Sequence, residues 1–129
     1  MKRPSLIMSS VAAIAALTLA ACGSDGGGGS SATVPADVDL EVLAGPGIRF
    51  DKSDYSATAG SVKVALVNRD SQAHSLDIVA EDCKKVPGEL KVSKSGDIDT
   101  GDFDLAAGTY KIVCLIPGHD AMKANLTVS

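Results

Sequence analysis

Four residues whose side chains bind transition metals lie in two short segments of this 129-residue chain. The segment "YKIVCLIPGHDAM" contains Cys114, His119 and Met122 within nine positions, and His74 lies upstream in "VNRDSQAHSLDIV". Beyond residue 22 the chain has two His and one Met, and all three belong to this set. A buried free Cys with an unrelated Met and two surface His is the alternative. Packing alone gives no reason to gather these residue types, so the pattern favours a metal site.

The combination of donors indicates which metal would bind. A thiolate and two imidazoles in one plane, with a thioether as a weak axial ligand, suit copper in both of its oxidation states. Thiolate and thioether favour Cu(I), and imidazole accepts either state. Zinc could use the Cys and both His, but it gains little from Met and usually takes a fourth strong ligand or a water. Copper is therefore the expected metal.

Short strands are the elements that must position these donors. Five segments are rich in β-branched residues and alternate between apolar and polar positions, with Gly, Pro, Asn and Asp between them. No comparably long helical pattern occurs. The five segments are residues 38–44, 61–68, 74–80, 109–114 and 124–129. Many short strands separated by turns predict a small β-sandwich or barrel.

Strand parity predicts where the donors point. His74 begins its segment and shares a face with Leu76 and Ile78, so it is expected to point inward. Cys114 ends its segment and shares a face with apolar residues, so it should also point inward. If these two strands are antiparallel neighbours, both side chains reach the same end of the sandwich. His119 would then lie in the loop that leaves that end.

The N-terminal region predicts export and a lipid anchor. Lys2 and Arg3 precede a short apolar run with small residues, which indicates a signal peptide over residues 1–21. "LAAC" resembles a bacterial lipobox, so Cys22 is expected to carry lipid; an ordinary secretory signal with a chance cysteine is the alternative. Residues 22–37 are rich in Gly and Ser and form a flexible linker.

The remaining residues, 38–129, are enough for one domain with one core. Loss of Lys2 and Arg3 with the signal leaves 10 basic and 16 acidic residues, a formal charge of −6. This charge argues against nucleic acid or anionic lipid headgroups as the main partner.

The two metal-binding segments together resemble those of the cupredoxins, the small blue copper proteins related to plastocyanin and azurin. The resemblance covers essentially all of residues 38–129. It implies an all-β Greek-key sandwich of about eight strands with one type 1 copper site. By the same resemblance, His74, Cys114 and His119 are the equatorial ligands and Met122 is the axial ligand.

Two features depart from the pattern of that family. The loop reads C-x4-H-x2-M, which combines the Cys-to-His spacing of azurin-like proteins with the His-to-Met spacing of amicyanin-like ones. Ser75 also stands where many cupredoxins have Asn, so the ligand loop must be braced by a shorter side chain. The reduction potential therefore cannot be inferred from the family.

Other chemistries have weaker support. A binuclear copper site needs a second Cys between Cys114 and His119, and multicopper oxidases need further His; both are absent from the sequence. Nucleophilic catalysis by this pair is conceivable on residue type alone. Residues 97–104 lack the terminal Glu of a calcium loop and are expected to form a solvated acidic hairpin. Cys83 is an unpaired cysteine, expected to be a partly buried free thiol rather than an intermolecular disulfide.

The resulting hypothesis is an electron carrier rather than an enzyme. It would be a monomer, exported and held by lipid at the outer face of the cytoplasmic membrane or in the periplasm. Its partners would be redox proteins such as a cytochrome, an oxidase or a reductase. The alternatives are a lipoprotein that stores or delivers copper without electron transfer, and a copper-free interaction module.

Overall fold

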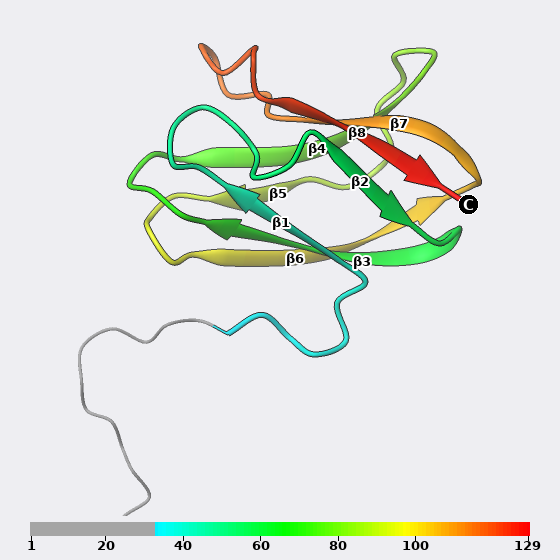
Figure 1. The fold of residues 1–129 in the computed structure, drawn as a ribbon, viewed down its shortest axis with the longest axis horizontal. Coiled ribbons are helices and arrows are strands. Elements are labelled where there is room, and N and C mark those ends of the chain that lie inside the picture. Colours follow the sequence, from blue (N-terminus) through cyan, green and yellow to red (C-terminus); the bar gives the residue numbers. More distant parts are fainter. Residues whose placement is uncertain (1–32) are drawn as a thin grey trace, which may run out of the picture. The chain divides into compact units, whose positions relative to one another are not determined.

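The computed structural model describes residues 33–129, which form eight strands and no helix. The predicted signal peptide, Cys22 and most of the predicted linker lie outside these residues. Within the described residues there is accordingly no helix that could cross a membrane. The strands form two sheets (Figure 1). The first has the order β1-β3-β6, with β1 at Leu40–Ala44, β3 at Gly60–Asn68 and β6 at Ile98–Leu105.

The second sheet has five strands in the order β2-β8-β7-β4-β5. Their bounds are Asp54–Ala57 for β2, Lys123–Val128 for β8, Gly108–Val113 for β7, His74–Ala80 for β4 and Leu90–Val92 for β5. Strand β2 pairs with β8 in parallel, as β1 does with β3, whereas every other pair is antiparallel. Neighbours in both sheets are mostly distant in sequence, which confirms the predicted all-β Greek-key sandwich.

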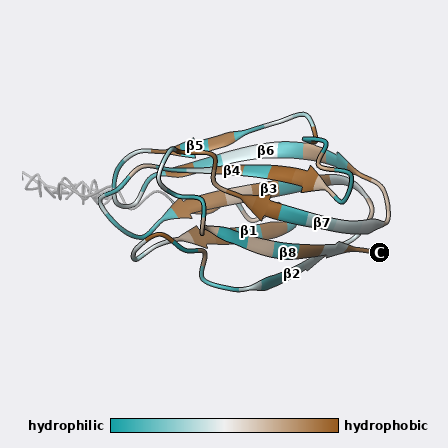
Figure 2. Cartoon of the chain, turned by 90° about the horizontal axis from the view of Figure 1, so that it is seen from above, coloured by the Kyte–Doolittle hydropathy of each residue, from teal (hydrophilic) through white to brown (hydrophobic). Residues whose placement is uncertain are grey.

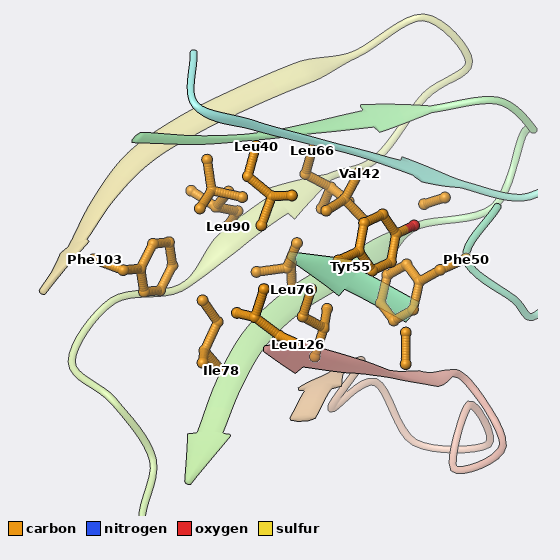
Figure 3. Packing of buried hydrophobic residues seen from close by; sticks show 14 of the residues in the cluster. Leu40, Val42, Phe50, Tyr55, Leu66, Leu76, Ile78, Leu90, Phe103 and Leu126 are labelled. Atoms are coloured by element: carbon orange, nitrogen blue, oxygen red, sulfur yellow. The ribbon is translucent and has the colours of Figure 1, made fainter. Parts of the chain in front are cut away.

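The core lies between the two sheets and follows the alternation of the strands. Side chains at alternate positions of β1, such as Leu40 and Val42, are buried against residues of the other sheet, such as Leu76 and Ile78 of β4. Figure 3 shows these residues with the aromatic rings of Phe50, Tyr55 and Phe103 in one apolar layer. Burial of this layer provides the main stabilisation of the domain, and it fixes the strands whose ends carry the predicted ligands.

The five predicted strands are present, with ends that differ from the predicted ones by at most two residues, but β2, β5 and β6 were not predicted. The prediction of an acidic hairpin over residues 97–104 is wrong, because most of that segment is strand β6. Phe103 and Leu105 point into the core from β6, while Asp102 and Asp104 point outward. The outward carboxylates dominate the composition and obscure the alternation. Figure 2 shows the contrast, with hydrophilic and neutral colours along much of β6 and hydrophobic colours on β3 and β4.

Strands β4 and β7 are antiparallel neighbours, as the sequence analysis required. Their register pairs Asp77 with Val113, so the start of β4 and the end of β7 lie at the same end of the sheet. The loops β1–β2, β3–β4, β5–β6 and β7–β8 all lie at this end in Figure 1. We call it the loop end of the sandwich.

Candidate metal centre

Three of the predicted ligands come together at the loop end. His74 is the first residue of β4, Cys114 directly follows β7, and His119 lies in the β7–β8 loop. Each offers one donor atom, and these atoms all lie within 4.8 Å of one another. The three residues are buried, with His74 fully so and His119 8% exposed. Residues from two strands and a loop thus form a compact cluster of one sulfur and two imidazoles.

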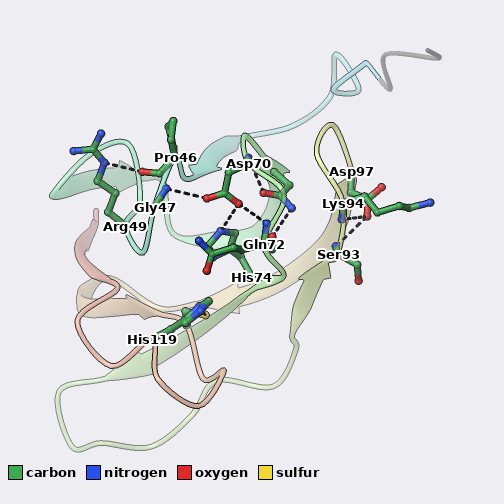
Figure 4. Close-up of polar contacts among 12 residues, drawn as sticks. Pro46, Gly47, Arg49, Asp70, Gln72, His74, Ser93, Lys94, Asp97 and His119 are labelled. Atoms are coloured by element: carbon green, nitrogen blue, oxygen red, sulfur yellow. Dashed lines mark hydrogen bonds and ion pairs between the residues drawn. The ribbon is translucent and has the colours of Figure 1, made fainter. Parts of the chain in front are cut away.

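The two nitrogens of His74 have different environments. Nε2 lies 3.0 Å from Oδ1 of Asp70, as Figure 4 shows. Nδ1 is buried and has no hydrogen-bond partner among residues 33–129. A buried ring nitrogen without a partner is costly unless something else binds it. Nδ1 of His74 is therefore the atom available to a metal.

The sulfur of Cys114 receives polar contacts from two sides. The backbone N–H of Ser75 donates to Sγ at 3.4 Å, and Nδ1 of His119 lies 3.5 Å from the same atom. The imidazole rings of His74 and His119 have centroids 5.3 Å apart and are tilted by 45°. The sulfur and the two rings therefore converge without blocking one another, which suits a metal ion held between them.

Two tight turns place the rest of the β7–β8 loop. The N–H of His119 donates to the carbonyl of Ile116 at 3.0 Å, and the N–H of Met122 donates to the carbonyl of His119 at 2.8 Å. The carbonyl of Met122 in turn accepts from the N–H of Cys114 at 3.1 Å. This pairing closes the loop and holds the backbone of Met122 beside that of Cys114. The side chain of Met122 is 1% exposed.

The residues present fit a type 1 copper ion on chemical grounds. One thiol and two imidazoles match the planar donors of such a site, and the unpartnered Nδ1 of His74 is left for a metal. The cluster at the loop end contains no carboxylate that would favour a hard cation. The binding of a metal by His74, Cys114, His119 and Met122 stays a prediction, but their placement at one end is a structural finding.

Two other residues differ from the expectations. Cys83 is an exposed free thiol in the loop after β4, not a partly buried one. It has a positive φ of 65°, a conformation typical of turns. Asp70 was not among the predicted site residues, yet its carboxylate contacts His74, a predicted ligand. The signal in the sequence is weak, because an Asp before a strand is common in turns.

Comparisons with known proteins show the fold. No protein-family model matches the chain, and no curated protein matches its sequence. Among solved structures, reduced auracyanin from Roseiflexus castenholzii is 23% identical with a TM-score of 0.61, covering 74% of this chain and 99% of that one. Auracyanin A from Chloroflexus aurantiacus, described as a "blue" copper protein, is 21% identical with a TM-score of 0.59, covering 69% and 96%.

A third similar structure is the purple cupredoxin from Nitrosopumilus maritimus. It is 20% identical with a TM-score of 0.54, and the match covers 70% of this chain and all of that one. These proteins are matched over nearly their whole length, although identity is low. The sandwich of eight strands is therefore the cupredoxin fold.

Proposed function

We propose that this protein binds a single copper ion as a type 1 centre and carries single electrons between redox proteins. The observation that carries the proposal is the buried cluster of His74, Cys114 and His119, whose donor atoms lie within 4.8 Å of one another. Copper would supply a one-electron couple. Cys114 would bind it as the thiolate, together with Nδ1 of His74 and one nitrogen of His119. The thioether of Met122 would be a weaker fourth ligand.

The burial of the cluster favours electron transfer over copper delivery. The strands and the closed β7–β8 loop hold the donors in place, so little rearrangement would accompany a change of oxidation state. A protein that delivers copper needs donors that a competing acceptor can reach. His74 and Met122 are at most 1% exposed, which argues against such access.

Two exposed apolar side chains at the loop end support docking of a redox partner. Among residues 33–129, the large hydrophobic side chains that are exposed are Ile48, at 41%, and Leu115, at 56%. They lie in the β1–β2 and β7–β8 loops, both at the loop end. Small apolar patches of this kind serve weak and transient complexes. Exposed carboxylates such as Asp102 would steer a basic partner without entering the contact.

We expect a monomer without enzymatic activity.

The location of the protein is also part of the proposal. Cleavage before Cys22 and lipidation of that residue would tether the domain through the linker to a membrane outside the cytoplasm. Mass spectrometry of the native N-terminus tests this. A diacylated or triacylated Cys22 supports the anchor, and a mature protein that begins at any other residue contradicts it.

Addition of Cu(II) to the purified protein tests the proposed copper site. We expect one copper per chain and an intense visible absorption from thiolate-to-copper charge transfer, which reversible reduction removes and reoxidation restores. Cu(I) should stay bound in the presence of a moderate competing chelator. A colourless protein contradicts the type 1 site. Rapid loss of Cu(I) to the chelator would instead support storage or delivery.

A further inference from the structure

Asp70, in the loop between β3 and β4, joins three parts of the loop end. Its Oδ1 lies 3.0 Å from Nε2 of His74 and also accepts from the N–H of Gln72 at 2.9 Å. Its Oδ2 accepts from the N–H of Gly47, in the β1–β2 loop, at 2.9 Å. Its own N–H donates to the side chain of Asn68 at 3.1 Å. The carboxylate in Figure 4 is therefore held by several independent contacts.

The carboxylate of Asp70 lies very close to the backbone of Gly45 in the β1–β2 loop. Gly45 has a φ of +84°, and a Cβ atom there would lie 2.5 Å from Oδ2 of Asp70. Glycine is thus needed both for the backbone conformation and for the close approach of the carboxylate. The side chain of Asp70 is 15% exposed, so water competes little for its hydrogen bonds.

The contacts of Asp70 suit an ionised carboxylate. Oδ1 accepts a hydrogen bond from the backbone N–H of Gln72, and Oδ2 accepts one from the backbone N–H of Gly47. An ionised carboxylate only accepts hydrogen bonds. Nε2 of His74 is therefore the donor to Asp70, and in a neutral imidazole a hydrogen on Nε2 leaves the lone pair on Nδ1, the atom without a partner.

We propose that Asp70 is a positioning residue that holds His74 in the Nε2–H tautomer, makes its Nδ1 a stronger donor, and so biases the copper site toward Cu(II). Partners in the outer shell are known to fix the tautomer and raise the basicity of a ligating histidine. A negative charge beside the ring also favours the more highly charged metal. The proposal rests on the proposed copper site, and it predicts a lower reduction potential than a neutral residue at position 70 would give.

The substitution Asp70→Asn tests this, because it removes the charge and keeps the shape of the side chain. We expect the ratio of Cu(II) to Cu(I) affinity to fall about tenfold, which raises the one-electron reduction potential by about 59 mV. The visible absorption should persist, since the four ligands remain. Asp70→Ala should shift the potential in the same direction and also weaken Cu(II) binding.

Asp97→Asn is the matched control. Asp97, in the β5–β6 loop, accepts hydrogen bonds from the backbone N–H groups of Ser93 and Lys94, both at 2.9 Å. This variant makes the same change of charge and weakens a comparable loop contact, but Asp97 does not contact His74. Its potential should equal that of the wild type. An equal shift in both variants, or no shift in Asp70→Asn, overturns the proposal.

A second measurement needs no copper. Nitrogen-15 NMR of the copper-free wild-type protein at one neutral pH reports which ring nitrogen of His74 is protonated. We expect hydrogen on Nε2, and a slowly exchanging ring proton that Asp70→Ala loses. Hydrogen on Nδ1 overturns the role of Asp70. Failure of the wild type to colour with Cu(II) would instead refute the copper site, so the two failures are distinguishable.

Discussion

Ser75 contacts the sulfur of Cys114 through two groups, its backbone N–H at 3.4 Å and its hydroxyl at 3.6 Å. The hydroxyl oxygen also accepts from the backbone N–H of Leu115 at 3.0 Å. One short side chain therefore braces the ligand loop and touches the thiol, which answers how Ser can stand where many cupredoxins have Asn. Hydrogen bonds to the cysteine sulfur tune the potential of such sites.

Ser75→Ala should lower the reduction potential, because the thiolate loses a donor and gives more charge to Cu(II). It should also cost about 1–2 kcal/mol of stability, since the N–H of Leu115 loses its acceptor. Potentiometric titration and urea unfolding measure the two effects. Ser75→Thr keeps the hydroxyl and should shift the potential less. An unchanged potential in Ser75→Ala would show that the hydroxyl does not act on the sulfur.

Cys114→Ser should abolish the visible absorption, because the copper–thiolate bond produces it. Cys83→Ser is the control, since Cys83 is exposed and lies outside the cluster. It should bind copper with an unchanged spectrum. Absorption spectra of both variants after addition of Cu(II) settle the ligand assignment, and the opposite pattern would refute it.

Met122→Leu should preserve copper binding and raise the reduction potential. An axial thioether contributes more to the potential than to affinity, and its loss disfavours Cu(II). Met122→Gln supplies an oxygen donor in the same place and should lower the potential. Copper content and potentiometry test the pair of variants. If Met122→Leu changes neither spectrum nor potential, Met122 is not a ligand.

Leu115→Glu should slow electron exchange with a redox partner tenfold or more, because it places a charge on the exposed apolar side chain that directly follows Cys114 in the β7–β8 loop. The copper spectrum should not change, since Leu115 is 56% exposed. Thr127→Glu places the same charge on an exposed position of β8 near its end, away from the ligand loop. Stopped-flow rates should be altered only in Leu115→Glu. Equal rates in all three proteins would mean that electrons leave by another route.

Lys85 compensates a buried charge beneath the loop that follows β4. Its Nζ lies 2.5 Å from Oδ1 of Asp77, whose side chain is fully buried, and neither carboxylate oxygen accepts a hydrogen bond of good geometry within residues 33–129. Lys85→Met should therefore destabilise the fold. Removal of one partner from a fully buried ion pair costs about 3–5 kcal/mol of stability. The loss in Lys85→Met should be smaller, because the side chain of Lys85 is 44% exposed.

Adding Asp77→Asn to Lys85→Met should recover part of that stability, since the unpaired charge is then removed. The close contact with the carboxylate of Asp77 raises the pKa of Lys85 above its usual value. The ion pair therefore stabilises the fold at neutral pH. This stabilisation is lost as the pH rises through the raised pKa of Lys85, which lies above the ordinary value of about 10.4. Urea unfolding between pH 7 and 11 measures both effects. Additive effects of the two substitutions would refute the coupling.

The sequence by itself determined the fold class, and it predicted the donor set. His, Cys and Met are rare in this chain, so their clustering was visible without a structure, and alternation in five segments was enough to indicate a sandwich. Alternation failed for β6, because Asp102 and Asp104 face outward beside a single inward ring, and for β2 and β5, which are only four and three residues long. Short strands are stabilised by their neighbours in the sheet, which no local pattern records.

Only the tertiary structure decided how the site is supported. The contact of Asp70 with His74 needs the β3–β4 loop to fold back on the strand it precedes, and Gly47 from another loop completes it. Ser75 reaches Cys114 only because β4 and β7 are antiparallel neighbours in one register. Hydrogen bonds act over about 3 Å, whereas these residues are separated by up to 39 positions in the chain. The predicted ligands can be recognised from their residue types in two short segments, but the groups that orient them come close only in the folded chain.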